Sequence, residues 1–149
     1  MTPSEQEEPP ADPNDRHRRT AAAWTAGERL SPAQERNVAT ITAWVEAYNA
    51  RAFDALAALA HADLIVDDPA TGTHLDGWPA FRTMAEEVVR RYPDRHITLS
   101  RMLPLSDSAV AVDADWNGTP AGGGPTEHRV EAMVFEFVGG KVAVRRIYR

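Results

Sequence analysis

Asp68 is the first residue whose type and position could support chemistry. It stands directly before Pro69, at the end of an apolar run over residues 64–66. A carboxylate at the end of a buried strand, among apolar side chains, can act as a general acid or base. The plain alternative is an Asx-type turn, in which the same side chain caps the strand end. We leave Asp67 out of the candidate site, because side chains alternate along a strand and it points the opposite way.

Glu131 is a second candidate acid on an otherwise apolar strand face. It shares strand parity with Met133, Phe135 and Phe137, so these side chains point to one side of a sheet. Two carboxylates in one pocket allow one to donate a proton while the other accepts one. The alternative is a salt bridge at the rim between Glu131 and an arginine of the last strand. Both interpretations stay open.

Arg145 and Arg146 are adjacent in the last strand, so one of them faces the same side as Met133. A two-residue turn at residues 139–140 would place Arg146 there, whereas an odd-length loop would place Arg145 there. An inward arginine suits a substrate carboxylate, or Glu131, because its fork matches carboxylate geometry.

Three helices are expected to position these residues from one side. Ser31 opens a capping-box pattern, and apolar residues at helical spacing then predict a helix over residues 31–51. A short helix is expected over residues 53–60. After a turn-rich loop, a third helix is expected over residues 77–91, with Met84 facing inward.

From residue 96 onward the apolar period changes to two. Four strands are expected over residues 96–103, 109–117, 129–138 and 141–148, separated by turn residues. Consecutive strands with short connections pair antiparallel, and helices that precede them in the chain form a separate layer. The predicted fold class is therefore α+β, a curved, mainly antiparallel sheet packed against three N-terminal helices around an apolar pocket.

Composition and motifs exclude several classes of site. The chain has 149 residues, a formal net charge of −6 and no cysteine, which excludes disulfides and thiolate metal sites. The negative charge argues against nucleic acid as a partner. His61, His74 and His96 lack the spacing of metal ligands, and P-loop and dinucleotide motifs are missing. We therefore expect no metal, no cofactor and no nucleic acid partner.

The first thirty residues differ in composition from the rest. Residues 1–30 combine four prolines with many acidic side chains, which predicts a disordered, acidic, Pro-rich tail. Residues 31–149 have the size of one ordinary domain. No apolar run approaches the ~20 residues that span a bilayer, and no secretory pattern is present. We expect a cytoplasmic protein without membrane contact.

The order of elements and three local strings resemble the ketosteroid isomerase and SnoaL-type polyketide cyclase group of the nuclear transport factor 2-like superfamily. The resemblance covers residues 35–149. Its strings are ADLIVDDP at residues 62–69, WNG at 116–118 and VFEFVGGKV at 134–142. It implies a cone-shaped fold with a deep pocket, a homodimer, and metal-free acid/base chemistry on hydrophobic polycyclic or polyketide substrates.

The resemblance also implies roles for single residues. Asp68 matches the general base of the isomerases. Their oxyanion tyrosine falls on Trp44 and their protonated aspartic acid on Met133, so both donors are replaced. Losing one such donor commonly costs about 10²–10³ in rate, which argues against steroid isomerisation. The aldol mechanism of the SnoaL cyclases is disfavoured too, because their aspartate lies near Met133.

Together these points predict a cofactor-free polyketide cyclase of secondary-metabolite (antibiotic) biosynthesis. It would close a ring on a hydrophobic, polyketide-derived substrate by shaping it, with acid/base help from Asp68 and Glu131. Epoxide hydrolysis, double-bond isomerisation and non-catalytic binding of a small molecule by a dimer are the alternatives. The residues expected to bind substrate share the inward faces of these elements: Trp44, Tyr48, Met84, Val112, Ala114, Trp116, Met133 and Arg145.

Overall fold

The computed structural model describes residues 29–149, so the tail predicted over residues 1–30 lies almost wholly outside the described residues. Three helices occupy the expected places: α2 (Pro32–Asn49), α3 (Phe53–Leu59) and α4 (Trp78–Arg91). The predicted capping box is present at the start of α2, where the Ser31 hydroxyl accepts a hydrogen bond from the Gln34 amide at 3.1 Å. Of the described helices, none is long and apolar enough to cross a membrane.

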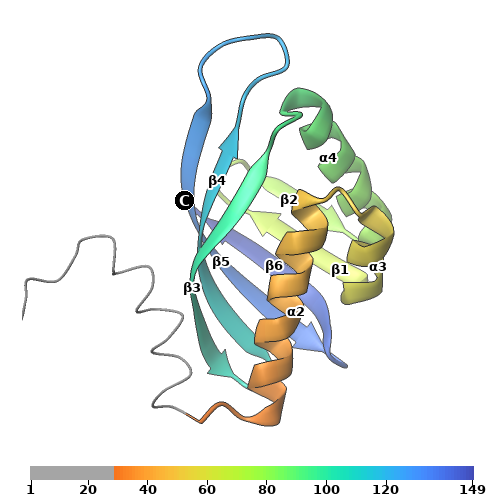
Figure 1. Ribbon diagram of the computed structural model, residues 1–149. Coiled ribbons are helices and arrows are strands. Elements are labelled where there is room, and N and C mark those ends of the chain that lie inside the picture. The colour runs from red at the N-terminus through yellow and green to blue at the C-terminus, as the bar shows by residue number, and fades with distance from the viewer. Residues whose placement is uncertain (1–28) are drawn as a thin grey trace, which may run out of the picture.

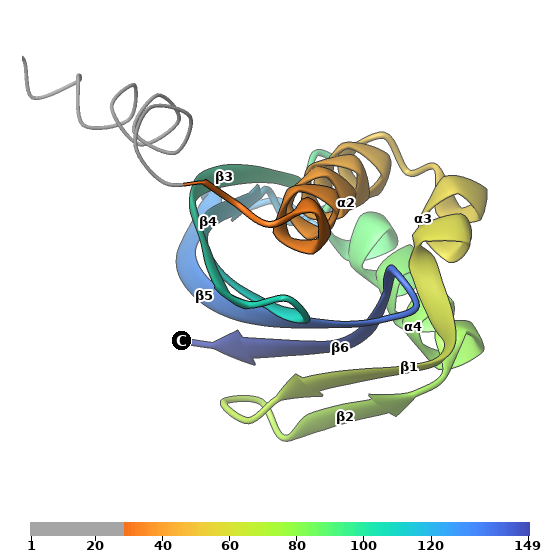
Figure 2. The same cartoon turned by 90° about the horizontal axis from the view of Figure 1, so that it is seen from below.

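The described strands form one six-stranded sheet: β1 (Ala60–Asp68), β2 (Thr73–Asp76), β3 (His96–Ser106), β4 (Ala109–Gly118), β5 (Glu127–Val138) and β6 (Lys141–Tyr148). Their spatial order is β2-β1-β6-β5-β4-β3, and each neighbouring pair is antiparallel except the parallel pair β1 and β6. The helices lie on one side of the sheet (Figure 1), and β3, β4 and β5 curl around α2 (Figure 2). The predicted α+β class is confirmed.

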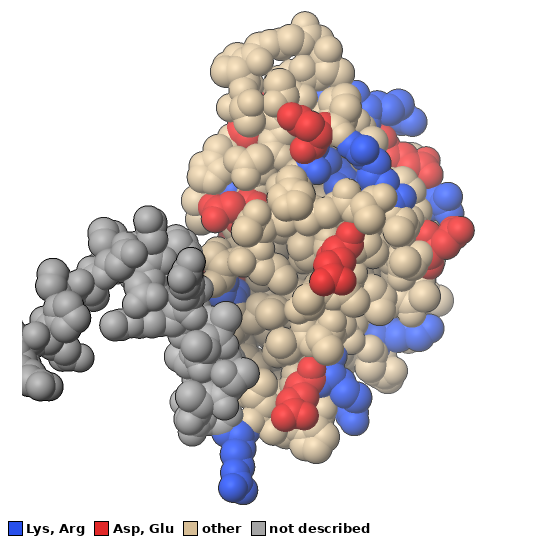
Figure 3. Space-filling model, in the orientation of Figure 1, with Lys and Arg blue, Asp and Glu red and all other residues tan. Residues whose placement is uncertain are grey.

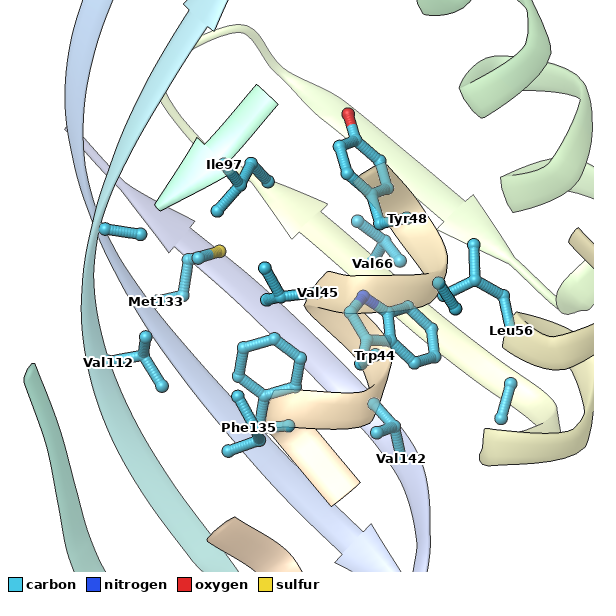
Figure 4. Close-up of a cluster of buried hydrophobic side chains, with 14 of the residues drawn as sticks. Trp44, Val45, Tyr48, Leu56, Val66, Ile97, Val112, Met133, Phe135 and Val142 are labelled. Atoms are coloured by element: carbon cyan, nitrogen blue, oxygen red, sulfur yellow. The ribbon is translucent and has the colours of Figure 1, made fainter. Parts of the chain in front are cut away.

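Aromatic and aliphatic side chains fill the space between α2 and the concave face of the sheet (Figure 4). The ring of Trp44 on α2 lies 5.5 Å from Phe81 on α4 and 6.3 Å from Phe135 on β5, measured between centroids. All three side chains are buried, and each phenylalanine stabilises the fold by about 1.5–3 kcal/mol through its removal from water. This core holds α2 and α4 at fixed positions against the sheet.

The turn between β5 and β6 sets a starting register for the last strand. Residues 139–140 are glycines with positive φ (59° and 77°) and form a two-residue turn that places Val138 opposite Lys141. Glycine suits this turn because both positions need the left-handed region. Continued unchanged, this register would place Arg146 opposite Met133.

A β-bulge at Ala143 changes that register by one residue. Val144 pairs with Glu136, so Ala143 is an extra residue in β6. One inserted residue reverses the face of every residue that follows it. Arg145 is therefore buried and Arg146 is exposed. Of the two alternatives, Arg145 is the one that faces inward, and it does so through the bulge and not through an odd-length loop.

The edge strand β2 was expected to be part of a loop. Its four residues pair with the end of β1, which sets His74 opposite Asp67. The His74 ring contacts the carboxylates of Asp67 and Asp76, and Arg146 also approaches Asp67, at 3.7 Å. The hydrogen bond to Asp67, supported by the charge of Asp76, raises the pKa of His74. Polar contacts between β1 and β2 thus help to hold β2 in the sheet. This strand is too short and too exposed to show an apolar pattern in the sequence.

We expect His74→Gln to destabilise the protein under acidic conditions and to have little effect under alkaline ones. A raised pKa in the folded state means that the protonated ring favours folding; this contribution is complete below the unfolded pKa of about 6.5 and is lost as pH rises through the folded pKa. Urea unfolding of both proteins at pH 5.5 and pH 8.5 measures the difference. An equal difference at the two pH values would contradict the assignment.

Candidate active site

A cavity of about 310 Å³ lies between α4, the end of α2 and the strands β1, β4, β5 and β6. Its apolar wall is made by large side chains: Tyr48, Val66, Met84, Val88, Tyr92, Trp116 and Ile147. The lining also contains seven charged residues, more than an apolar pocket would have: Asp68, Glu87, Arg91, Arg129, Glu131, Arg145 and Arg149. Figure 3 shows acidic and basic side chains gathered on the side of the molecule where α4 lies.

Asp68 and Glu131 meet at one guanidinium group inside this cavity. Arg149 Nη2 donates a hydrogen bond to Asp68 Oδ2 at 2.7 Å and lies 3.6 Å from Glu131 Oε1. Both acids are buried, with 5% and 4% of their surface exposed. Asp68 Oδ1 is also buried and has no hydrogen-bond partner among the described residues. The site therefore contains two converging carboxylates, one with a free acceptor oxygen.

The strand registers explain this convergence. Asp68 is the last residue of β1, which runs parallel to β6 with Asp67 opposite Arg146. On the other side of β6, Met133 lies opposite Ile147, and the same register continued by two residues brings Glu131 beside Arg149. Side chains opposite each other on neighbouring strands share a face, so the C-terminal residue can reach acids from β1 and β5.

Arg149 was missed by the sequence analysis, although its position carried a usable pattern. It has the same strand parity as Arg145 and Ile147, both of which point inward. The expectation that Glu131 could pair with an arginine of the last strand is close to what is observed, since Arg149 directly follows β6. What the sequence could not show is that the same arginine also binds Asp68.

The other expected residues divide between the cavity and the core. Tyr48, Met84, Trp116 and Arg145 line the cavity. Four residues expected to line the substrate site do not border this cavity and are buried in the core, which corrects their expected place: Trp44, Val112, Ala114 and Met133.

The reason for this correction is the depth of the core layer. The Trp44 ring is enclosed by Phe81 and Phe135, and Met133 lies under Arg145, whose Nη2 contacts the Met133 sulfur at 3.4 Å. The sequence pattern places these side chains on the inward face of their elements. It does not distinguish the inward side chains that are buried in the core from those that line the cavity.

Trp116 forms an ordered part of the cavity wall. The ring of Tyr92 meets it edge-on at 5.0 Å between centroids, and the guanidinium of Arg129 lies 4.5 Å above it. Such stacking is favourable because the ring face is electron-rich. Within residues 29–149, no group of three or more His, Asp or Glu side chains is placed to hold a metal ion.

Residues 41–145 match the SnoaL-like domain. This chain belongs to the SnoaL-like family. No curated protein sequence matches this SnoaL-like chain. Its fold is that of ketosteroid isomerase-like, or nuclear transport factor 2-like, proteins.

Three solved structures illustrate the likeness of this SnoaL-like chain. A protein of ketosteroid isomerase-like fold from Catenulispora acidiphila, in complex with trimethylamine, is 20% identical with a TM-score of 0.68, covering 74% of this chain and 84% of its own. A provisional SnoaL-like polyketide cyclase from a Jannaschia species is 14% identical with a TM-score of 0.72, and the match covers 82% of this chain and 90% of the cyclase chain. An epoxide hydrolase from Mycobacterium tuberculosis is 17% identical with a TM-score of 0.67, and the match covers 76% of this chain and 82% of the hydrolase chain. At these identities the likeness shows the fold.

We expect Arg149→Met to destabilise the SnoaL-like chain by about 1–3 kcal/mol, because two buried carboxylates lose their shared cation. The value is below that of a fully buried pair, since the Arg149 side chain is 27% exposed. Adding Asp68→Asn should recover part of the loss, and a double-mutant cycle by urea unfolding measures the coupling. Arg146→Met, which loses a surface contact with Asp67, is the control and should change stability by less than about 0.5 kcal/mol. Equal losses from both arginines would refute a special role for Arg149.

Proposed function

We propose that this SnoaL-like chain is an acid/base enzyme that closes an oxygen ring on a hydrophobic, polyketide-derived substrate, by opening an epoxide with a hydroxyl group of the same molecule. The observation that supports this function is the convergence of Asp68 and Glu131 on Arg149 inside the cavity. Two carboxyl groups in one site suit a reaction in which one oxygen loses a proton while another gains one. Epoxide opening by a hydroxyl group has this requirement.

Asp68 is assigned as the base. The hydrogen bond from Arg149 holds Oδ2 in place, and the lone pairs of Oδ1 have no partner among the described residues, so Oδ1 can accept a proton. Asp68 removes the proton of the substrate hydroxyl. The hydroxyl oxygen then bonds to an epoxide carbon while the bond between that carbon and the ring oxygen breaks.

Glu131 is assigned as the acid. Its Oε1 lies 3.6 Å from Arg149 Nη2, beyond hydrogen-bond distance, so a proton on Glu131 displaces no hydrogen bond from the arginine. Glu131 gives its proton to the epoxide oxygen as the carbon–oxygen bond breaks, and the product is a cyclic ether with a new hydroxyl group. One proton then passes from Asp68 to Glu131, through water, before the next turnover.

The apolar wall supplies the orientation that ring closure needs. Tyr48, Met84 and Trp116 come from three different elements and border the same cavity. A chain folded against them can hold its hydroxyl group close to the epoxide, and such proximity alone lowers the barrier substantially. The replacement of the isomerase oxyanion donors by Trp44 and Met133, both in the core, is compatible with this reaction because no enolate forms.

Epoxide hydrolysis is the second candidate, and it is favoured by the same convergence of carboxylates. Water takes the place of the substrate hydroxyl, and Asp68 and Glu131 keep their roles. The fold likeness to the epoxide hydrolase of Mycobacterium tuberculosis supports it. Ring closure and hydrolysis both need Asp68 as the base and Glu131 as the acid. They differ in the nucleophile, which is the substrate hydroxyl group in one and water in the other.

The test uses a 4,5-epoxy alcohol with a naphthyl tail and the matching epoxide without the hydroxyl group, in water enriched in oxygen-18. Asp68→Asn and Glu131→Gln should each lower turnover about 10²-fold or more, the usual contribution of a positioned acid or base. Ring closure gives a product without the heavy isotope, whereas hydrolysis gives a labelled diol.

Asp67→Asn is the matched control, because Asp67 is next in the chain but faces the His74 and Arg146 side of β1. It should keep turnover within a few-fold of wild type. Equal rates for wild type and Asp68→Asn would mean that the pocket acts by shape alone. Binding without any turnover would leave the non-catalytic alternative.

We propose further that the protein is a homodimer that pairs through the face of β5 turned away from α2. Val130 on this face is 68% exposed, and Tyr148, diagonal to it on β6, is 47% exposed. Large exposed apolar side chains on a sheet face are typical of protein contacts. Val130→Lys should convert a dimer into a monomer in sedimentation experiments, while Val138→Lys, at the hairpin end, should not. A wild-type protein that sediments as a monomer would refute the dimer.

A further inference from the structure

Two arginines lie inside the fold away from any acidic partner among the described residues. Arg145 on β6 is 5% exposed, and Arg95, just before β3, is 3% exposed. Arg95 donates a hydrogen bond to the Tyr48 carbonyl at 2.7 Å, and its guanidinium stacks 3.5 Å from the centroid of the Tyr48 ring. Burial lowers the pKa of Arg95, and the positive charges of Arg51 and Arg145 lower it further. The interior beside the cavity therefore carries excess positive charge.

Arg145 is the member of this pair that lines the cavity. Its Nη2 contacts the Met133 sulfur at 3.4 Å, and thioether sulfur is a weak acceptor. Its Nε is buried without a partner. In the described part of the chain, no carboxylate lies within ion-pair distance of Arg145, whereas Arg149 has two.

An arrangement of this kind is unfavourable for the protein alone. Removing an ion from water costs several kcal/mol, and proteins normally compensate it with an opposite charge and full hydrogen bonding. Arg145 has neither. The missing counter-charge and acceptors can come from a ligand, because Arg145 lines the cavity.

We propose that the substrate carries a carboxylate that binds Arg145, so that the enzyme acts on hydrophobic acids. This deepens the proposed function and rests on it in taking the cavity as the substrate site. A carboxylate fits because the fork of arginine can donate two parallel hydrogen bonds to it. With the acid group held at Arg145, the rest of the molecule lies along the apolar wall toward Asp68.

The charges of the lining favour an anion with a single charge. Arg149 is balanced by Asp68 when Glu131 holds the proton assigned to it above, and Arg129 pairs with Glu127 at 2.9 Å. Glu87 and Arg91 contribute one charge of each sign. One buried cation at the cavity wall is left without compensation, which one carboxylate neutralises. A doubly charged phosphate would bring excess negative charge next to Asp68 and Glu131.

The test compares three probes of one shape: 2-naphthylacetate, 2-naphthylacetamide and 2-(2-naphthyl)ethylamine. Their dissociation constants are measured by titration calorimetry and by quenching of tryptophan fluorescence, since Trp116 lines the cavity. We expect the carboxylate to bind about tenfold or more tightly than the neutral amide, as hydrogen bonds to charged groups contribute more than neutral ones. The amine should bind most weakly.

Arg145→Met should remove the preference for the acid over the amide while the amide still binds. Arg146→Met is the matched control, because it removes an arginine one residue further along that faces the opposite side and approaches Asp67, and it should keep the preference. Ligand-free Arg145→Met should also unfold at a higher temperature than wild type, because an uncompensated buried charge is replaced by an apolar side chain. A purely structural arginine would give the opposite shift.

Several results would overturn the inference. They are a wild type that binds the acid no more tightly than the amide, a tighter amine, an acid preference that survives in Arg145→Met, or a lower unfolding temperature for that variant. Arg145→Lys is the second variant, and it should reduce the preference several-fold, because the fork is lost. These are equilibrium measurements. Failure of the carboxylate inference with normal Asp68-dependent turnover is therefore distinct from failure of the proposed reaction.

Discussion

The register of β6 is the constraint on which the site depends. The two glycines of the turn set one parity, and the bulge at Ala143 reverses it for the rest of the strand. That reversal places Arg145, Ile147 and Arg149 on the side of the cavity and Arg146 on the outside. A hairpin without the bulge would put a different arginine next to the core and leave Asp68 without its guanidinium partner. One extra residue in β6 thus decides which charged side chains of that strand line the cavity.

The distribution of buried charge is the second feature that organises the molecule. Two buried acids share Arg149, which compensates one of their two negative charges where they meet. Arg145 lies in the same cavity without such compensation, beside a further buried guanidinium at Arg95. Buried charges of this kind weaken the protein in isolation, and they are therefore better explained by what enters the cavity than by the stability of the fold.

The fold and the chemistry are separable in this chain. The core around Trp44 and Phe135 supports the curved sheet and would do so for any activity. The SnoaL-like family gives the architecture, and one superfold hosts many unrelated reactions. The proposed reaction rests instead on the charged residues that border the cavity, which differ from the oxyanion donors expected of the isomerases.

The sequence by itself determined the helices, the four consecutive strands and the α+β class, because local periodicity and capping depend on neighbouring residues alone. The inward positions of Asp68 and Glu131 were expected from the resemblance to the isomerase and cyclase group. The sequence did not reveal the short strand β2, whose polar residues carry little periodic pattern. Nor could it separate Met133 in the core from Tyr48 at the cavity, since parity gives a face and not a depth. The bulge at Ala143 and the contact of Arg149 with Asp68, 81 residues away in the chain, depend on how β1, β5 and β6 lie side by side. That arrangement is fixed only by tertiary packing.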